Sequence, residues 1–322
     1  MRVALVAAFG GPEQIRFVER DAPEPGAGEL RVRVEAAGVN FLDVYHRTGL
    51  YGGELPFALG REGAGVVEAL GAGVSGFAAG ERVAWTGVPG SYATHVVARA
   101  EDVVKVPAGL DVTRAAAVLL QGLTAHYLTR STWPLRRGER CLIHAAAGGV
   151  GLLFCQMARM VGAEVFGTVS SDEKARLARE AGATHVIDYT RLAFDEEVGR
   201  VTGGALLEVV YDSVGRTTFE KSLRCLRPRG LFVSFGQSSG PVPSFAPRVL
   251  SDHGSLFFTR PTLRDYTRTR EELESRAGEV LGWAASGAIA VRIHAVLPLD
   301  RAADAQRLLE SRATTGKLVL QP

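Results

Sequence analysis

The stretch from Leu142 to Gly151, which reads L-I-H-A-A-A-G-G-V-G, constrains the fold of this chain most strongly. Leu142 and Ile143 predict a short buried strand, and the alanines and glycines after them predict a tight turn that opens a helix. Small residues in such a turn let the backbone approach a ligand, and the free N–H groups of a helix start favour a phosphate. The spacing A-x-x-G-x-x-G is a variant of the dinucleotide-binding fingerprint, with Ala145 in place of the first glycine. Ordinary packing turns share this composition. The strands and helices around the turn therefore have to show whether it is a dinucleotide-binding turn.

Strands and helices alternate along the part of the chain that contains this turn. Strands are predicted at residues 141–145, 164–169, 185–187, 208–211 and 231–235. Helices are predicted at residues 150–160, 171–181, 194–201 and 218–226. This alternation is typical of an α/β fold with a doubly wound parallel sheet and right-handed crossovers. The fingerprint then lies on the first strand-to-helix turn, which is where a dinucleotide site requires it.

The first 110 residues or so have a different pattern, which predicts a β-rich, barrel-like domain. Apolar residues alternate with polar ones from Leu30 to Ala36, as in a half-buried strand, and glycines separate further short apolar runs. Residues 39–47 predict a helical turn that carries polar groups. Asp111 is expected to cap a helix that Gly122 breaks, and a second helix is expected to reach about residue 130.

The last sixty residues do not continue the strand–helix alternation. They follow a sixth strand predicted at 255–258, and they predict a charged helix at 270–285, a strand at 288–296, a helix at 300–309 and a final strand at 317–320. We expect these terminal elements to rejoin the first domain. The expected domains are therefore residues 1–120 with 260–322, which form a β-rich catalytic domain, and residues 121–259, which bind the nucleotide.

Composition excludes several classes of protein. The net charge of +2 is too small to indicate a nucleic-acid surface, and no run of about 18 apolar residues is present. The N-terminus lacks the pattern of a secretory signal. The three cysteines, Cys141, Cys155 and Cys225, are far apart and predict core residues in a reducing compartment. We therefore expect a soluble cytoplasmic protein without a membrane segment or a zinc site.

The end of the second parallel strand indicates which nicotinamide cofactor is used. In an NAD enzyme a carboxylate about 20 residues past the glycines accepts a hydrogen bond from the ribose 2′-hydroxyl. Ser170 stands near that position, and Lys174 follows on the next helix. A hydroxyl and an ammonium group favour the 2′-phosphate of NADP(H). The alternative is that Lys174 is an ordinary surface residue and that Asp172 contacts the ribose.

Taken together, several motifs resemble the quinone oxidoreductase, or zeta-crystallin-like, branch of the medium-chain dehydrogenase/reductase superfamily, and its bacterial NADPH:quinone reductases in particular. The resemblance covers nearly the whole chain. The motifs that carry it are G-V-N-F-L-D-V-Y-H-R-T-G-L-Y (38–51), G-R-E-G-A-G-V-V (60–67), Q-G-L-T-A (121–125), H-A-A-A-G-G-V-G (144–151), V-Y-D-S-V-G (210–215), S-F-G-Q-S-S-G (234–240), T-R-P (259–261) and E-S-R-A-T-T-G (310–316).

The resemblance implies a GroES-like catalytic domain made from both chain ends, a Rossmann domain inserted into it, and a homodimer in which strands of the two nucleotide domains pair. Zinc-dependent relatives carry Cys and His at the positions of Asn40 and Arg61. This chain also lacks the four-cysteine lobe of those relatives. It is therefore similar to the zinc-free branch, and no metal is expected.

The resemblance also implies site residues. Asn40, Tyr45 and Asp43 are expected beside the nicotinamide and the substrate, although Asn40 could instead satisfy backbone groups at a turn. His46 is expected to be a surface or packing residue. The residues expected to bind the cofactor are Thr124, Ala147, Gly148, Gly149, Val150, Gly151, Ser170, Lys174, Tyr189, Ser213, Phe235, Gly236, Ser238, Thr259, Arg260 and Arg312.

The activity expected from this resemblance is reduction of a quinone or a related conjugated carbonyl by NADPH without a metal. Negative charge that develops on the substrate oxygen then needs hydrogen-bond donors, for which Tyr45 and Asn40 are the candidates. One alternative is an alkenal, enone or enoyl-thioester double-bond reductase on the same scaffold. Another is a non-enzymatic NADPH-binding protein of the crystallin or RNA-binding kind, but the chain shows no basic stripe that would bind RNA.

Overall fold

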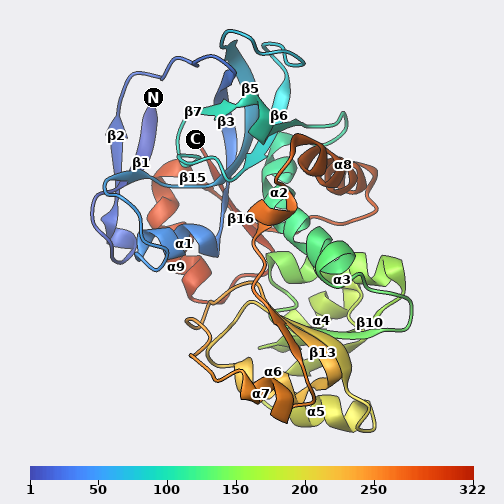
Figure 1. Ribbon diagram of the computed structural model, residues 1–322. Helices are drawn as coiled ribbons and strands as arrows, with labels where there is room; N and C mark the ends of the chain where they lie inside the picture. Colours follow the sequence, from blue (N-terminus) through green and yellow to red (C-terminus); the bar gives the residue numbers. More distant parts are fainter. The chain divides into compact units, whose positions relative to one another are not determined.

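The computed structural model describes all residues from Met1 to Pro322, and they form two compact units (Figure 1). The first unit combines Met1–Leu123 with Thr267–Pro322, and the second is Thr124–Tyr266. The boundaries expected from the sequence were 120/121 and 259/260. The expected fold class is confirmed, because a β-rich unit and a parallel α/β unit are both present.

The first unit contains two sheets. The larger has seven strands in the order β15-β16-β3-β5-β6-β8, with β7 paired to β3. Its strands are β3 (Glu29–Val39), β5 (Glu62–Leu70), β6 (Arg82–Thr86), β7 (His95–Arg99), β8 (Val103–Lys105), β15 (Ile293–Pro298) and β16 (Lys317–Gln321). The smaller has the order β2-β1-β4, with strands β1 (Arg2–Val6), β2 (Ile15–Glu19) and β4 (Phe57–Ala58).

Both ends of the chain contribute to the larger sheet. β16 pairs antiparallel with β3, so that Leu318 lies opposite Val39 and Leu320 opposite Ala37. Leu318 and Leu320 are buried in the same apolar core as the centre of β3. In Figure 1 the red C-terminal elements accordingly lie among the blue N-terminal ones. Burial of alternate residues from both segments stabilises the pairing of strands that are far apart in sequence.

Helices complete the first unit. They are α1 (Phe41–Arg47), α8 (Arg270–Ser286), α9 (Ala302–Glu310) and the short 3-10 turns η1 (Pro12–Gln14), η2 (Ala100–Asp102) and η5 (Leu299–Arg301). The helix α2 (Val112–Tyr127) begins in the first unit and ends in the second. Asp111 caps it as predicted, because its Oδ1 accepts the Arg114 N–H at 2.8 Å.

The prediction that Gly122 breaks a helix is wrong. α2 runs without interruption through Gly122 and continues as a π-helical turn, η3 (Leu128–Thr132). A Cβ atom on Gly122 would lie 2.5 Å from Cγ1 of Val280 in α8. The glycine therefore serves close packing of two helices, and this tertiary contact outweighs its low helix propensity.

The second unit is a six-stranded parallel sheet in the order β11-β10-β9-β12-β13-β14. Its strands are β9 (Arg140–Ile143), β10 (Glu164–Val169), β11 (His185–Asp188), β12 (Leu207–Asp212), β13 (Leu226–Ser234) and β14 (Phe257–Thr259). Its helices are α3 (Gly149–Val161), α4 (Asp172–Ala181), α5 (Phe194–Val201), α6 (Phe219–Arg224), α7 (Arg248–Asp252) and the 3-10 turn η4 (Leu263–Tyr266). The strand order reverses between β9 and β12, and ligands of doubly wound sheets bind at the carboxyl edge of that point.

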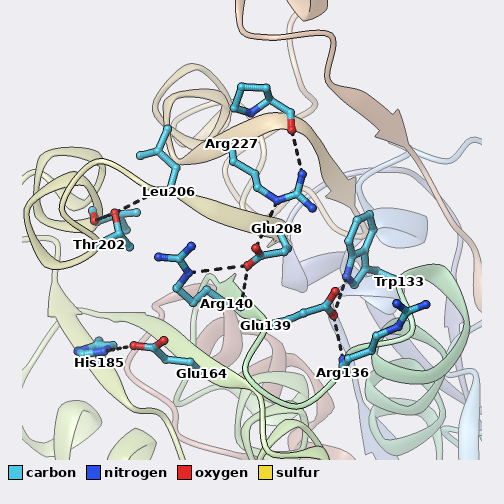
Figure 2. A network of polar contacts seen from close by, with 12 residues as sticks. Trp133, Arg136, Glu139, Arg140, Glu164, His185, Thr202, Leu206, Glu208 and Arg227 are labelled. Carbon is cyan, nitrogen blue, oxygen red and sulfur yellow. Dashed lines mark hydrogen bonds and ion pairs between the residues drawn. The ribbon is translucent and has the colours of Figure 1, made fainter.

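Polar contacts close the opposite, amino edge of this sheet (Figure 2). Glu208 of β12 accepts the Arg140 N–H of β9 at 2.8 Å and a hydrogen bond from Arg227 at 3.3 Å. Glu164 of β10 lies 2.7 Å from the ring nitrogen Nε2 of His185 on β11. These contacts satisfy backbone and side-chain groups where the strands begin, so the amino edge carries structural bonds while the carboxyl edge carries the turns described below.

Most predicted elements are confirmed within a few residues. β10 and α5 have the predicted bounds, whereas α7 was not predicted and β15 begins at Ile293 rather than at residue 288. All three cysteines are buried and unpaired. No helix is both long and apolar enough to span a bilayer.

We predict that Gly122→Ala lowers the free energy of unfolding by about 1 kcal/mol or more, because the added methyl group must displace Val280. The matched control is Gly278→Ala in α8, where nothing lies within 4 Å of an added Cβ. It should stabilise the protein by roughly 0.5–1 kcal/mol through helix propensity. Urea denaturation measures both effects. Equal gains from the two substitutions would show that Gly122 has no packing role.

Candidate functional site

The turn between β9 and α3 has the backbone that the sequence fingerprint predicts. Ala145 has a φ of 54°, in the left-handed region that costs an L-residue roughly 1–2 kcal/mol. Its carbonyl oxygen accepts the Gly148 N–H at 2.8 Å and so closes the turn. α3 then begins at Gly149 with no side-chain cap on Gly148. The N–H groups of its first turn can therefore bind a phosphate.

Two glycines allow the turn, the helix and the neighbouring strand to approach closely. A Cβ on Gly151 would lie 2.3 Å from the Ala145 carbonyl oxygen and 2.7 Å from the Ala146 backbone. A Cβ on Gly167 of β10 would lie 2.7 Å from the Ala146 Cβ. These contacts give the third position of the fingerprint a packing reason, since any side chain at residue 151 would displace backbone atoms.

The residues expected around an adenosine phosphate follow the carboxyl ends of β10 and β11. The Lys174 ammonium group donates to Ser170 Oγ at 3.2 Å. Burial lowers the pKa of Lys174, and the charge of Glu173 opposes this shift. Tyr189, whose side chain is 47% exposed, donates its backbone N–H to the Val169 carbonyl oxygen at 3.1 Å. The structure thus brings both strand ends together at one edge.

Arg191 is a cation at this edge that the sequence reasoning missed. Its guanidinium group donates two hydrogen bonds to Asp172, at 2.9 and 3.1 Å, and lies 3.4 Å from Asp188. Asp172, the alternative ribose contact, is therefore engaged by an arginine. The signal was available in the sequence, because Arg191 stands two residues after Tyr189.

Asp212, at the end of β12, organises the loops on the other side of the switch point. Its Oδ1 accepts the N–H groups of Val214 and Gly215, at 2.6 and 2.9 Å. Its backbone oxygen accepts the Phe235 N–H at 2.8 Å. These bonds give Asp212 a structural role at the end of its strand, and they join the loop after β12 to the loop after β13.

Most of the residues expected near the nicotinamide lie on these loops. The Ser238 N–H donates to the Ser213 carbonyl oxygen at 3.0 Å, and a Cβ on Gly236 would lie 2.9 Å from the same oxygen. Arg260 follows Thr259, the last residue of β14, and donates to the Ser234 carbonyl oxygen at 2.9 Å. The carboxyl ends of β12, β13 and β14 therefore bring Ser213, Phe235, Gly236, Ser238, Thr259 and Arg260 to one edge.

Two of the expected cofactor residues lie elsewhere. Thr124 is buried in the last turn of α2. Arg312 belongs to the first unit, where it follows α9 with a φ of 59°.

In the first unit, Asn40 caps α1 and is held by its neighbours. Its side-chain amide nitrogen donates to Glu62 at 2.9 Å and to the Gly38 carbonyl oxygen at 3.3 Å, and its amide oxygen accepts from Lys317 at 2.7 Å. Both amide hydrogens are thus engaged inside the unit. Glu62 and Lys317 were missed by sequence reasoning, because no local pattern links residues so far apart.

Glu62 and Lys317 form a buried ion pair. Their side chains are 0% and 1% exposed, and Glu62 also accepts the Leu120 N–H of α2 at 2.7 Å. A Cβ on Gly38 would lie 2.2 Å from the Glu62 carboxylate and 2.8 Å from Lys317 Cε. Gly38 therefore makes the room in which β3, β5 and β16 bring these charges together.

Asp43 lies on the buried side of α1. Its Oδ2 accepts the Asn40 N–H at 2.9 Å and the Tyr92 hydroxyl at 3.0 Å. Burial raises the pKa of Asp43 from its usual 3.8 to about 7, and nearby Glu62 adds to the rise, whereas the two hydrogen bonds and Lys317 oppose it. Asp43 is therefore partly protonated at neutral pH.

Tyr45 is surrounded by aromatic rings on and after α1. Its ring centroid lies 5.2 Å from that of Tyr51 and 6.1 Å from that of Phe41. His46 packs edge-on against Tyr51 and Phe57, at 5.7 and 6.3 Å, which agrees with the packing role expected for it. Burial, followed by the charge of Arg61, lowers the pKa of His46. The aromatic rings at this end of the first unit therefore surround the Tyr45 side chain with apolar contacts.

The structure contains no group of three or more His, Cys, Asp or Glu side chains that could hold a metal ion. At the two positions where the resemblance places zinc ligands, Asn40 is bound by Glu62 and Lys317, and Arg61 is half-buried. The absence of a metal from the reaction stays a prediction.

We predict that Lys317→Met lowers the free energy of unfolding by about 3–5 kcal/mol, because it leaves Glu62 buried and unpaired. The double variant Glu62→Gln, Lys317→Met should recover much of this loss. Lys105→Met, at an exposed pair with Glu81, should cost about 1 kcal/mol or less and serves as the control. A Lys317→Met variant as stable as the control variant would contradict the buried pair. Chemical denaturation measures all three.

Comparison with known proteins identifies the family. Residues 26–108 match the alcohol dehydrogenase GroES-like domain, and residues 149–281 match the zinc-binding dehydrogenase domain. The chain is 49% identical to the quinone oxidoreductase of Pseudomonas aeruginosa, over 98% of each chain, and 44% identical to quinone oxidoreductase 1 of Escherichia coli, over 97% of each. The crystal structure of Escherichia coli quinone oxidoreductase complexed with NADPH has a TM-score of 0.98 with this chain, at 43% identity and over 100% of both chains. The chain therefore belongs to the quinone oxidoreductase family of the medium-chain dehydrogenase/reductase superfamily.

Proposed function

We propose that this protein is an NADPH-dependent quinone reductase that reduces quinones or related conjugated carbonyls without a metal ion. The observation that carries this proposal is similarity over the full length of the chain to enzymes named quinone oxidoreductase, one of them solved with NADPH. The zinc-free part of the proposal has separate support, because Asn40 and Arg61 are not usual zinc ligands.

The second unit fits a dinucleotide at its carboxyl edge. Bound NADPH supplies the hydride. We assign the pyrophosphate to the uncapped start of α3, residues 147–151, with Thr124, and the adenosine 2′-phosphate to Ser170, Lys174 and Tyr189. The nicotinamide half is assigned to Ser213, Phe235, Gly236, Ser238, Thr259 and Arg260 of the second unit. The resemblance also implies a cofactor contact for Arg312 of the first unit, and this stays a prediction. The close approach of backbone atoms at Gly151 and at Gly236 supports the compact turns that these assignments require, because a side chain there would displace the neighbouring turn.

The first unit supplies the groups that stabilise the substrate. Negative charge develops on a quinone oxygen when hydride arrives, and a positioned O–H or N–H group stabilises it. The candidate donors are the Tyr45 hydroxyl and the Asn40 side-chain amide, which would exchange a hydrogen bond to Glu62 or to Gly38 for one to the substrate. Asn40 also stands at the start of α1, where its backbone N–H donates to Asp43 of the same helix.

A double-bond reductase acting on enones or enoyl thioesters would use the same hydride chemistry, and a non-enzymatic NADPH-binding protein would use the same cradle. The non-enzymatic protein has no observation in its favour. The double-bond reductase has one, because the chain is 41% identical to the 2-haloacrylate reductase of Burkholderia sp., over 99% of this chain, but the relatives named quinone oxidoreductase are more similar. The substrate panel described below separates all three.

We also propose a homodimer in the cytoplasm. β14 is an edge strand of the second unit, and Phe257 on it is 60% exposed, which suits pairing with the same strand of a second copy. Three buried, unpaired cysteines suit a reducing compartment. Sedimentation equilibrium distinguishes a dimer from a 34.3 kDa monomer.

We expect the purified protein to oxidise NADPH with simple quinones, faster than with enals, enones or enoyl thioesters, and faster than it oxidises NADH. Prior treatment with EDTA should leave the rate unchanged. Absorbance at the nicotinamide band follows the reaction. Oxidation with enones alone would favour the double-bond reductase, no oxidation with any acceptor would favour the non-enzymatic protein, and loss of activity with EDTA would overturn the metal-free mechanism.

We predict that Lys174→Ala raises the KM for NADPH by roughly tenfold or more, because a charge-assisted contact with the 2′-phosphate is lost. The KM for NADH should change little. Lys221→Ala on α6, where the lysine faces Asp195 at 3.7 Å, is the matched control and should leave both values unchanged. Equal losses for the two nucleotides would show that the phosphate lies elsewhere.

A further inference from the structure

The two carboxyl oxygens of Asp43 have different surroundings. Oδ2 accepts both hydrogen bonds, from the Asn40 N–H at 2.9 Å and from the Tyr92 hydroxyl at 3.0 Å. Oδ1 is buried and has no hydrogen-bond partner. An unpaired, buried carboxylate oxygen is costly, and a proton removes its charge. A proton on Oδ1 therefore neutralises Asp43 while both bonds to Oδ2 remain.

The charges that face Asp43 do not cause the rise in its pKa, which comes from burial, because the attraction of Lys317 for the carboxylate exceeds the repulsion by Glu62. Lys317 on β16 lies close enough to attract the carboxylate, but its ammonium group is already bound to Glu62 and Asn40. Glu62 on β5 repels the Asp43 carboxylate. Arg61, a half-buried cation just before β5, attracts it. With Asp43 neutral, Lys317 and Glu62 balance each other. With Asp43 ionised, these three buried groups carry a net negative charge.

Tyr92 is fixed against Asp43 by packing. A Cβ on Gly60 would lie 2.4 Å from Cδ1 of Tyr92 and 2.6 Å from its backbone nitrogen. Gly60 has a φ of 92°, which favours glycine. The tyrosine is therefore held tightly, and its hydroxyl reaches Asp43 from outside α1.

We propose that Asp43 is a positioning residue that holds a proton on Oδ1, so that α1 presents Asn40 and Tyr45 without a buried negative charge on the same helix. This inference rests on the proposed function, because it assumes that α1 faces the reacting carbonyl. Asp43 does not touch the substrate and does not give up its proton during turnover. It keeps the start of α1 in place through Oδ2 in either charge state.

The protonation state then affects the rate more than the fold. Reduction places negative charge on the substrate oxygen, and an ionised Asp43, two residues before Tyr45, opposes that charge in a medium that screens it weakly. The protonated residue does not. Activity should therefore fall as the pH rises through the pKa of Asp43, which is about 7.

The test compares the pH dependence of kcat/KM for a simple quinone in the wild type, Asp43→Asn and Tyr92→Phe, between pH 6 and pH 9. The wild type should lose on the order of tenfold across this range. Asp43→Asn keeps an oxygen for Asn40 and Tyr92 and cannot ionise, so its profile should lose this alkaline decline. Tyr92→Phe removes a bond that lowers the pKa of Asp43, so the decline should move to higher pH.

Two results would overturn the proposal. If Asp43→Asn keeps the alkaline decline of the wild type, another group titrates. If Asp43→Asn is folded but inactive at every pH, the carboxyl group is a proton donor to the substrate and not a positioning residue.

Stability provides a readout that does not depend on activity. Because the folded pKa is raised, the unfolded chain binds fewer protons between about pH 4 and pH 7, so the free energy of unfolding of the wild type should fall as the pH rises through this window. The curve of Asp43→Asn should lack this fall, and parallel curves would overturn the proposal. If the wild type reduces no quinone, the proposed function fails, while the stability curves still decide whether Asp43 holds its proton.

Discussion

The first unit depends on one buried ion pair between segments that are far apart in the sequence. Lys317, at the start of the last strand, meets Glu62 of β5, and Asn40 at the start of α1 bonds to both. Taking these charges out of water is costly unless every partner is in place. The pair is therefore compatible with one arrangement of β3, β5 and β16, and that arrangement holds α1 with its candidate site residues. Gly38 is part of the same constraint, because any side chain there would occupy the space of the pair.

Close approach of backbone atoms likewise constrains the arrangement of the turns in the second unit. Gly151 and Gly236 lie where a Cβ would meet carbonyl oxygens of neighbouring turns, at 2.3 and 2.9 Å. The carboxyl edge of the sheet is consequently built from tightly packed turns, whereas ion pairs around Glu208 close the amino edge (Figure 2). The two edges of one sheet thus have different chemistry, and the edge with uncapped helix and loop N–H groups is the one suited to an anionic cofactor.

The elements that the sequence predicted well are those whose apolar pattern is local. The strand Glu164–Val169 and the helix Phe194–Val201 have the predicted bounds, because a short buried apolar run and helical periodicity are patterns of a few neighbouring residues. Gly122 was misjudged because its neighbour Val280 lies on another helix. Arg191 could have been recognised from its place after a strand end, but Glu62 and Lys317 could not, since their partners come from other strands.

The sequence by itself determined the fold class, the position of the dinucleotide fingerprint and the resemblance that supplied the candidate residues, because each depends on short-range spacing. It did not determine the charge states or the bonding of those residues. The partial protonation of Asp43, the full engagement of Asn40 and the ion pair beneath it arise only where β3, β5, β16 and α1 meet and exclude water. Burial and long-range contacts set these properties, and they exist only in the folded chain.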